Sequence, residues 1–389
     1  MSVASQQTGV AEDFLSERAV LAALQELVRI PSVNPALAPG EGTGEGAIAA
    51  HVCRWFQQRG VRSWLEEAAP GRPNAVAQVG SGSGPVLALC AHLDTVSTAG
   101  MTIPPFEPRM DGGRVYGRGS YDMKGGAAAI LCAAAWLAKK ALRGTVMAAL
   151  VADEEYASIG ARAFVAKHRA DACILTEASE KQLIVAHKGF VWAEIVTRGK
   201  AAHGSRWDLG VSAIGKMGRI IAALERFDAE VLRARKHALV GPASQHCALV
   251  SGGEGLSTYS PECRLKIERR TLPGETPEQV IGELRDVVAS CGEEAEITLL
   301  LERAPMVTSD ESPIARITHA AIHEATGSAP AHSGVSYWMD AALFSAAGAD
   351  TVNYGPSGAG AHEAVEWVDL NSVVTCARVL ARAAEKYCG

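Results

Sequence analysis

Apolar residues in the first half of the chain occur in two alternating patterns. Short continuous runs at Val86–Cys90, Thr145–Val151 and Ala172–Leu175 predict strands that are buried on both faces. Between and before these runs, apolar positions recur with helical spacing, which predicts helices near Leu15–Arg29, Glu45–Gly60, Met123–Ala141 and Ile159–His168. This alternation predicts an α/β fold with a mostly parallel sheet flanked by helices.

After Lys188 the order of the elements changes. The patterns predict a strand, a helix, two strands, a helix and a strand, at Phe190–Val196, Gly210–Phe227, His246–Ser251, Arg264–Arg270, Pro277–Ser290 and Glu296–Leu301. The order β-α-β-β-α-β is that of a ferredoxin-like α+β domain. From Pro313 to the C-terminus, helical and strand patterns again alternate as they do in the first half of the chain.

The chain therefore predicts an α/β domain interrupted by an inserted one. The first part of the α/β domain is expected at 1–187, the inserted domain at 188–304, and the second part of the α/β domain at 305–389. A length of 389 residues agrees with two packed units, because one hydrophobic core seldom grows to this size.

Composition excludes several classes of protein. Apolar residues make up 48% of the chain and charged residues 21%, without an uninterrupted apolar stretch long enough to span a membrane. The net charge of -6 is mixed along the chain and offers no basic footprint for nucleic acid. The N-terminal sequence MSVASQQTGVAEDF shows no signal-peptide pattern. We therefore expect a soluble, cytoplasmic protein that acts on a small molecule, without nucleic acid or membrane partners.

The nine cysteines are scattered and form no CxxC pair. Cys90, Cys132 and Cys173 lie in apolar surroundings, which is typical of reduced core thiols rather than of disulfides or thiolate metal sites. Any metal site must then use histidines and carboxylates.

Residues that bind metals or move protons follow four of the predicted strands. They are His92 and Asp94 after the first run, Glu154 and Glu155 after the second, Glu177 after the third, and His362 after Thr351–Tyr354. Ligands of an open parallel sheet bind beyond the carboxyl ends of its strands, so these side chains are expected to converge.

The glycine-rich segment Gly117–Gly126 presents one more carboxylate, Asp122, at the start of a predicted helix. Two histidines with three or four carboxylates suit a dinuclear zinc, cobalt or manganese centre. Two such ions, about 3.5 to 4 Å apart, can share a hydroxide and polarise a carbonyl group. Taken alone, a His-x-Asp or Glu-Glu pair also fits a solvated surface, and only their joint occurrence at strand ends indicates a metal site.

Several short motifs carry a resemblance to a known family: AHLDTV, GRGSYDMKGG, VADEE, LTEAS, GKAAHGS, ERRTLPGE and GPSGAGAHEAVEW. Over nearly its whole length, including the inserted domain, the chain resembles the dinuclear-zinc family of acetylornithine deacetylase, succinyl-diaminopimelate desuccinylase, aminoacylase and the glutamate-releasing carboxypeptidases.

The resemblance implies a role for each matching residue. One metal ion would be held by His92 and Glu177 and the other by Glu155 and His362, with Asp122 bridging both. Asp94 would orient His92. Glu154 would be the general base that takes a proton from water and gives it to the leaving nitrogen.

The resemblance also implies that 1–187 and 305–389 form the catalytic domain and that 188–304 is a lid or dimerisation domain. It implies substrate contacts as well. In this family a Glu rather than an Asp at position 177 accompanies acylases and carboxypeptidases more than aminopeptidases, so the substrate would carry a free carboxylate beside the scissile amide. His203 would reach across a dimer to donate to the oxyanion, and Arg270 would grip the carboxylate. One departure concerns Thr258-Tyr259-Ser260-Pro261, where many relatives have Asn before Val-Pro. This departure leaves open a substrate other than those of the named biosynthetic enzymes.

The sequence thus predicts a dimeric hydrolase of N-acyl amino acids, with the side chain and the acyl group left open. A carboxypeptidase or dipeptidase with the same metal chemistry is the nearest alternative. A non-catalytic metal or amino-acid binding protein on the same fold is a remote one, because such a protein would be expected to lack the base that Glu154 supplies.

Overall fold

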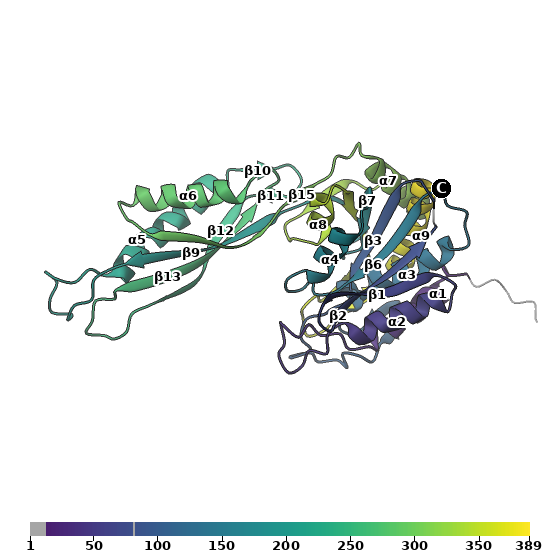
Figure 1. Cartoon of the computed structure of the whole chain (residues 1–389), viewed down its shortest axis with the longest axis horizontal. Helices are drawn as coiled ribbons and strands as arrows, with labels where there is room; N and C mark the ends of the chain where they lie inside the picture. Colours follow the sequence, from purple (N-terminus) through teal and green to yellow (C-terminus); the bar gives the residue numbers. More distant parts are fainter. Residues whose placement is uncertain (1–12, 81) are drawn as a thin grey trace, which may run out of the picture. The chain divides into compact units, whose positions relative to one another are not determined.

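The computed structural model describes residues 13–80 and 82–389, which form two compact units (Figure 1). Unit 1 contains the described residues up to Leu183, together with Ser309–His332 and Leu343–Gly389, and unit 2 contains Ile184–Thr308 and Ser333–Ala342. Residues 1–12, which hold most of the segment without a signal pattern, lie outside the described residues. Among the described helices, none is both long and apolar enough to cross a membrane.

A mostly parallel sheet forms the centre of unit 1. Six of its strands follow the order β1 (Arg62–Ala69), β2 (Arg72–Val79), β6 (Thr145–Val151), β3 (Val86–His92), β7 (Ala172–Leu175) and β17 (Asp350–Asn353). The last four run parallel, whereas β1 and β2 form an antiparallel hairpin that the sequence patterns did not predict. Every residue of β6 and β7 is buried, which explains their uninterrupted apolar sequences. The predicted α/β class is confirmed.

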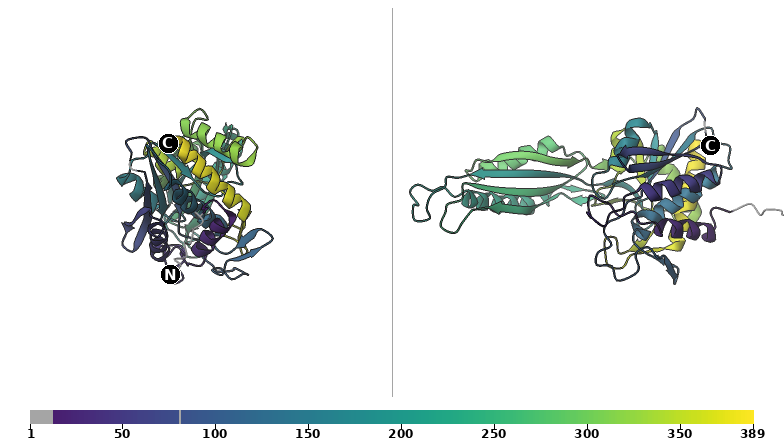
Figure 2. Two further views of the ribbon diagram at one scale, coloured as in Figure 1. Left: turned by 90° about the vertical axis from the view of Figure 1, so that its right-hand side faces the viewer. Right: turned by 60° about the horizontal axis from the view of Figure 1, so that its bottom comes forward.

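Helices cover this sheet. They include α1 (Glu17–Val28), α2 (Gly46–Gln57), α3 (Gly125–Leu137), α4 (Ile159–Lys167), α7 (Pro313–Thr326), α8 (Ala341–Ala346) and α9 (Leu370–Cys388). The alanine-rich α3 is buried at all but one of its positions because it packs against α1, α9 and β3. Figure 2 shows α9 in yellow crossing unit 1. Side-chain caps fix the starts of α1, α7 and α9, where Ser16, Ser312 and Asp369 accept backbone N–H groups.

A second, smaller sheet in unit 1 flanks the segments of chemical interest. Its strands follow the order β18 (Gly358–Ala359), β19 (Trp367–Asp369), β5 (Arg114–Tyr116) and β4 (Arg109–Asp111). The turn η1 (Ser120–Lys124) begins shortly after β5, and His362 lies between β18 and β19. The antiparallel pairing of β19 with β5 therefore holds the Asp122 and His362 segments together.

Unit 2 contains the predicted β-α-β-β-α-β order. Its elements are β9 (Gly189–Arg198), α5 (Ala213–Phe227), β12 (Ser244–Gly252), β13 (Glu262–Thr271), α6 (Pro277–Ser290) and β14 (Glu296–Arg303). The strands form an antiparallel sheet in the order β12-β13-β9-β14. Both helices lie on one face of it (Figures 1 and 2), where residues such as Ile195, Leu265, Met217 and Leu284 form the core.

The bounds of unit 2 differ from the predicted insertion at 188–304. The strand β8 (Leu183–His187) pairs with β15 (Met306–Val307) and with β16 (His332–Val335), which extends the unit at both ends and adds Ser333–Ala342 to it. Trp338 of that segment packs edge-on against His187 and lies under the guanidinium of Arg303. Such contacts between distant segments leave no local pattern in the sequence. η2 (Asp228–Leu232), β10 (Lys236–His237) and β11 (Gly241–Pro242) complete the unit.

Candidate metal centre

The parallel strands of unit 1 deliver charged side chains to one edge of the sheet. His92 is the last residue of β3, Glu177 follows β7 by two positions, and Glu154 and Glu155 follow the end of β6. Because β3 pairs in parallel with both β6 and β7, their carboxyl ends meet.

Two turns add Asp122 and His362 to the same place. Gly119 adopts a left-handed backbone with φ 76°, which lets the chain turn sharply before Asp122. His362 itself has φ 62°, a conformation that few residues other than glycine adopt. Glycine adopts this conformation without strain, whereas the turn at His362 holds its residue in position at a cost in local backbone energy.

The five side chains form two groups of three that share Asp122. In the first group, His92 Nε2 lies 3.1 Å from Asp122 Oδ1 and 3.5 Å from Glu177 Oε1. In the second, His362 Nε2 lies 3.3 Å from Asp122 Oδ2 and 3.1 Å from Glu155 Oε2. One oxygen of Asp122 thus faces each group, which is the arrangement a bridging carboxylate requires.

The charges of this cluster perturb its pKa values. Hydrogen bonds to Asp122 and Glu155 raise the pKa of His362 to about 10. Burial raises the pKa of Asp122, but the hydrogen bonds from His362 and His92 outweigh it and hold that pKa below its usual range. For Glu155, burial and the nearby Asp122 charge raise the pKa. Positive charge is therefore needed to stabilise the ionised carboxylates, and protonated imidazoles or metal ions can supply it.

The cluster fits divalent metal ions. Within each group the candidate ligand atoms lie within 4.8 Å of one another, and they comprise imidazole nitrogens and carboxylate oxygens only. The buried Glu155 Oε1 has no hydrogen-bond partner among the described residues, so this oxygen has an unused acceptor site. Nitrogen and oxygen donors without thiolate suit zinc, cobalt or manganese.

Asp94 connects the cluster to a buried polar network. Its backbone oxygen lies 3.0 Å from His92 Nδ1, which leaves Nε2 of that ring for the cluster. Its carboxylate accepts the backbone N–H groups of Glu154 and Glu155 at 3.1 and 3.2 Å. Asn34 donates to Asp94 at 2.8 Å, so three residues from two other segments donate to one buried carboxylate.

Sequence patterns did not indicate the outer part of this network. The Asn34 amide also donates to Asp153 at 2.9 Å, and Arg72 donates to Asp153 at 3.0 Å and to Glu45 through two hydrogen bonds. Asp153 precedes the Glu154-Glu155 pair and could have been suspected from that adjacency. Asn34, Arg72 and Glu45 lie in segments without any other signal of chemistry.

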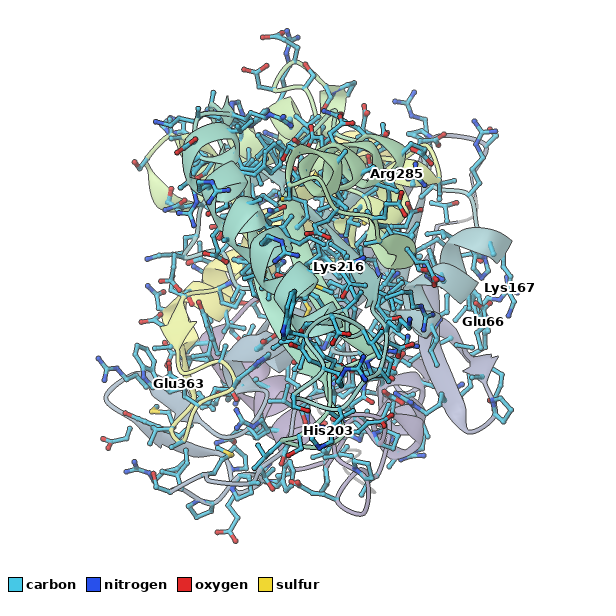
Figure 3. All side chains as sticks on the ribbon, turned by 90° about the vertical axis from the view of Figure 1, so that its left-hand side faces the viewer. Glu66, Lys167, His203, Lys216, Arg285 and Glu363 are labelled. Atoms are coloured by element: carbon cyan, nitrogen blue, oxygen red, sulfur yellow. The ribbon has the colours of Figure 1, made fainter. Side chains whose placement is uncertain are left out.

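His203 and Arg270 belong to unit 2. His203 lies exposed in the loop before α5 (Figure 3), and its backbone pairs with Thr258 in an isolated bridge. Arg270, on β13, donates to Glu268 at 2.7 Å, and its guanidinium carbon lies 5.2 Å from the Phe190 ring centre. Both side chains are accessible within their unit.

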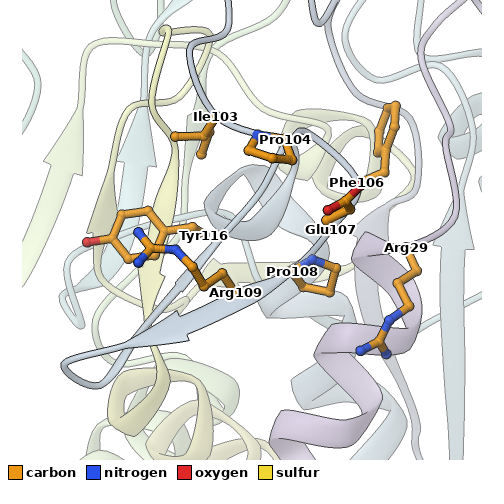
Figure 4. Close-up of a pocket in the computed structure, with 8 residues that line it drawn as sticks. All are labelled: Arg29, Ile103, Pro104, Phe106, Glu107, Pro108, Arg109 and Tyr116. Carbon is orange, nitrogen blue, oxygen red and sulfur yellow. The ribbon is translucent and has the colours of Figure 1, made fainter.

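A surface pocket of about 520 Å³ lies elsewhere in unit 1 (Figure 4). Its lining includes Phe106, Tyr116, Arg29 and Arg109 and contains none of the five clustered residues. Arg109 is already paired with Asp111 at 3.0 Å and stacks over Tyr116. The pocket is therefore separate from the candidate metal centre.

Comparison with known proteins identifies relatives of this chain. Residues 88–386 match the family described as peptidase family M20/M25/M40. An acetylornithine deacetylase from Myxococcus xanthus is 32% identical over 340 residues, which cover 84% of this chain and 87% of that protein. A second acetylornithine deacetylase, from Vibrio atlanticus, is 30% identical over 278 residues, covering 69% of this chain and 73% of that protein.

Solved structures share the fold. An aminopeptidase from Bacillus cereus superposes with a TM-score of 0.78 at 19% identity, covering 96% of this chain and 99% of the other. A dinuclear metal-binding peptidase of the M20 family from Bacillus subtilis gives 0.74 at 17% identity, covering 95% and 98%. Because the family match extends over most of the chain, the protein belongs to peptidase family M20/M25/M40 and is a metallopeptidase or amidohydrolase of that family.

Proposed function

We propose that the protein hydrolyses the amide bond of an N-acyl amino acid, with two divalent metal ions, zinc in the first place and cobalt or manganese as substitutes. The observation that carries this proposal is the pair of ligand groups that share Asp122. The sequence similarity to acetylornithine deacetylases supports deacylation in particular.

Each ligand group would hold one ion. His92 and Glu177 would bind the first and Glu155 and His362 the second, with one oxygen of Asp122 on each. When bound, two such ions polarise a carbonyl oxygen and make water more acidic. Asp94 holds the His92 ring by its backbone oxygen, which keeps Nε2 directed at the cluster.

Glu154 would move the proton. It accepts a proton from the water whose oxygen bonds to the amide carbon, and it returns this proton to the nitrogen as the C–N bond breaks. The products are a carboxylic acid and a free amino acid. The hydrogen bond from the Glu154 backbone to Asp94 supports this role, because it fixes the base next to a ligand residue.

Two residues of unit 2 would act on the substrate. Ser205 donates its backbone N–H to His203 Nδ1 at 3.3 Å, which favours the tautomer whose Nε2 carries a proton for an oxyanion. Arg270 would bind the free carboxylate of the substrate, and its hydrogen bond to Glu268 and its contact with Phe190 support a fixed orientation of the guanidinium.

We also propose that unit 2 mediates a homodimer and supplies His203 to the partner's site. β12 is an edge strand of the four-stranded sheet, and its Leu249 and Val250 are 65% and 61% exposed. An exposed apolar edge strand is a surface that another chain can pair with.

In this proposal unit 1, which holds the ligand groups, is the catalytic domain, and unit 2, which holds His203 and Arg270, is the lid.

A substrate screen tests the function. N-acetyl, N-succinyl and N-formyl amino acids and dipeptides would be assayed with zinc, cobalt and manganese, before and after chelation. We expect hydrolysis of at least one N-acyl amino acid that is lost on chelation and restored by zinc or cobalt. Turnover of dipeptides alone would favour the carboxypeptidase or dipeptidase alternative, and activity that survives complete removal of metal would reject the mechanism.

A further inference from the structure

Four hydrogen-bond donors converge on the buried carboxylate of Glu366, which is 1% exposed. Its Oε2 accepts from Arg118 Nη1 at 2.7 Å and from the Gly119 backbone N–H at 2.8 Å. Its Oε1 accepts from the backbone N–H groups of Tyr121 and Asp122 at 2.9 and 3.0 Å. The turn that presents Asp122 is thus wrapped around one carboxylate.

Arg118 extends this contact to two other segments. It is 2% exposed and donates through Nε to the Ser97 carbonyl and through Nη2 to the Glu363 carbonyl, both at 3.1 Å. Ser97 follows the end of β3, and Glu363 is the neighbour of His362. The planar guanidinium therefore ties together the segments that carry His92, Asp122 and His362.

From these contacts we propose that Glu366, together with Arg118, is a positioning residue that holds Asp122 in place between the two ligand groups. This inference rests on the proposed metal-dependent function. Two backbone N–H groups on one oxygen, one of them that of Asp122 itself, fix the peptide from which the bridging side chain extends. Asp122 can then meet both groups without paying for loop ordering when metal binds.

Substitution by glutamine tests the carboxylate without changing its size. In Glu366→Gln one acceptor oxygen becomes an NH₂ donor that faces N–H groups, so two of the four hydrogen bonds cannot form. Arg118→Lys is the second variant, because it keeps the charge but removes the fork that reaches Ser97 and Glu363.

Glu66→Gln is the matched control. Glu66 is a 9% exposed carboxylate of unit 1 that pairs with His168 at 2.7 Å and lies near Lys167 (Figure 3). It lies on β1 and pairs with residues 167 and 168 rather than with the Asp122 turn, so it reports the general effect of neutralising a buried glutamate.

Two measurements on the full-length chain decide the question. The first is amide hydrogen exchange of the segment 117–124 after chelation. Loss of the hydrogen bonds to the replaced oxygen should speed exchange by about tenfold or more, at Tyr121 and Asp122 if Oε1 is replaced and at Gly119 if Oε2 is replaced. The second is titration with Co²⁺, which reports the dissociation constant of each ion and the cobalt absorption spectrum. We expect Glu366→Gln to raise the dissociation constant of one Co²⁺ ion by about 10-fold to 100-fold, as for other residues that orient metal ligands.

Arg118→Lys should shift both readouts in the same direction, and Glu66→Gln should shift neither. Exchange and cobalt affinity at wild-type levels in Glu366→Gln would overturn the inference, and if that variant does not fold, wild-type values in Arg118→Lys would do so. A wild-type chain that binds no cobalt would instead remove the proposed function, and exchange alone would then decide whether Glu366 holds the turn.

Discussion

Asp94 Oδ1 accepts the backbone N–H of Glu154 at 3.1 Å, so the end of β3 fixes the start of the segment after β6. Its other carboxylate oxygen accepts the N–H of Glu155 at 3.2 Å. Two adjacent glutamates are thereby held by one buried group, while their side chains differ in surroundings. Both residues are half-buried, but Glu155 contacts His362 at 3.1 Å, whereas Glu154 lies outside both ligand groups.

This difference predicts separate effects of two isosteric substitutions. Glu154→Gln should keep both metal ions and lose most of the turnover, by about 10² to 10⁴-fold, because only proton transfer is removed. Glu155→Gln should lower metal content, because it removes a charged candidate ligand. Metal analysis beside steady-state kinetics checks both. A drop in metal content in Glu154→Gln but not in Glu155→Gln would mean that the two roles are reversed.

Arg270→Ala is expected to weaken hydrolysis of free-carboxylate substrates far more than of their amides or methyl esters. Loss of a charge-assisted contact should cost about 1.5 to 3 kcal/mol, or roughly a tenfold to 150-fold drop in kcat/KM. Paired kinetics on the acid and its methyl ester measure this difference. Equal losses on both substrates would assign Arg270 a structural role instead.

The control for Arg270 has to be chosen from the structure. Arg269 is the adjacent residue on β13, but it is 1% exposed and shares Glu275 and Glu283 with Arg235, so its removal would disrupt an ion-pair network and leave a gap beneath the strand. Arg264 of the same strand is exposed and contacts Glu262 and Glu194. Arg264→Ala should leave the ratio between acid and ester unchanged.

Mixing of subunits tests the proposed role of His203. His203→Ala should lower turnover by about a hundredfold to a thousandfold and leave metal content intact. Co-refolding it with Glu154→Ala pairs an intact metal site on one chain with an intact His203 on the other, and should restore one working site in each heterodimer. If mass measurement shows heterodimers that stay inactive, His203 does not act in the partner's site.

We expect the buried His187 ring to make a pH-dependent contribution to the stability of the fold. Burial lowers its pKa from 6.5 to about 4, because the ring is enclosed and its Nε2 has no hydrogen-bond partner among the described residues. The unfolded chain therefore binds more protons between these values, so stability falls as the pH drops from 6.5 to 4, by about 3 kcal/mol for this group.

Denaturant unfolding at several pH values measures this contribution. His187→Gln cannot titrate, so its stability relative to the wild type should rise as the pH falls through this window. Parallel pH profiles for the two proteins would show that His187 does not titrate as its burial requires.

Much of the fold could be predicted because local patterns of apolar and polar residues determine its elements. The uninterrupted apolar runs of β3, β6 and β7 predicted buried parallel strands, and the order of elements predicted the antiparallel sheet of unit 2. The β1–β2 hairpin was missed: its apolar and polar residues follow neither a clean alternation nor a continuous run. The return of Ser333–Ala342 to unit 2 depends on Trp338 packing, which has no local signature.

The candidate site divides in the same way. The sequence by itself determined that His92, Glu155 and Glu177 would meet, because each follows a parallel strand and such strands end at one edge. Only the tertiary structure decided which groups hold them there: Asn34 on Asp94, and Glu366 on the Asp122 turn. These partners are chosen by the angle and distance at which remote segments pack, and hydrogen bonding depends on that geometry to within a few tenths of an ångström. A single sequence specifies residue types and local periodicity, but the distances between remote side chains exist only once the chain is folded.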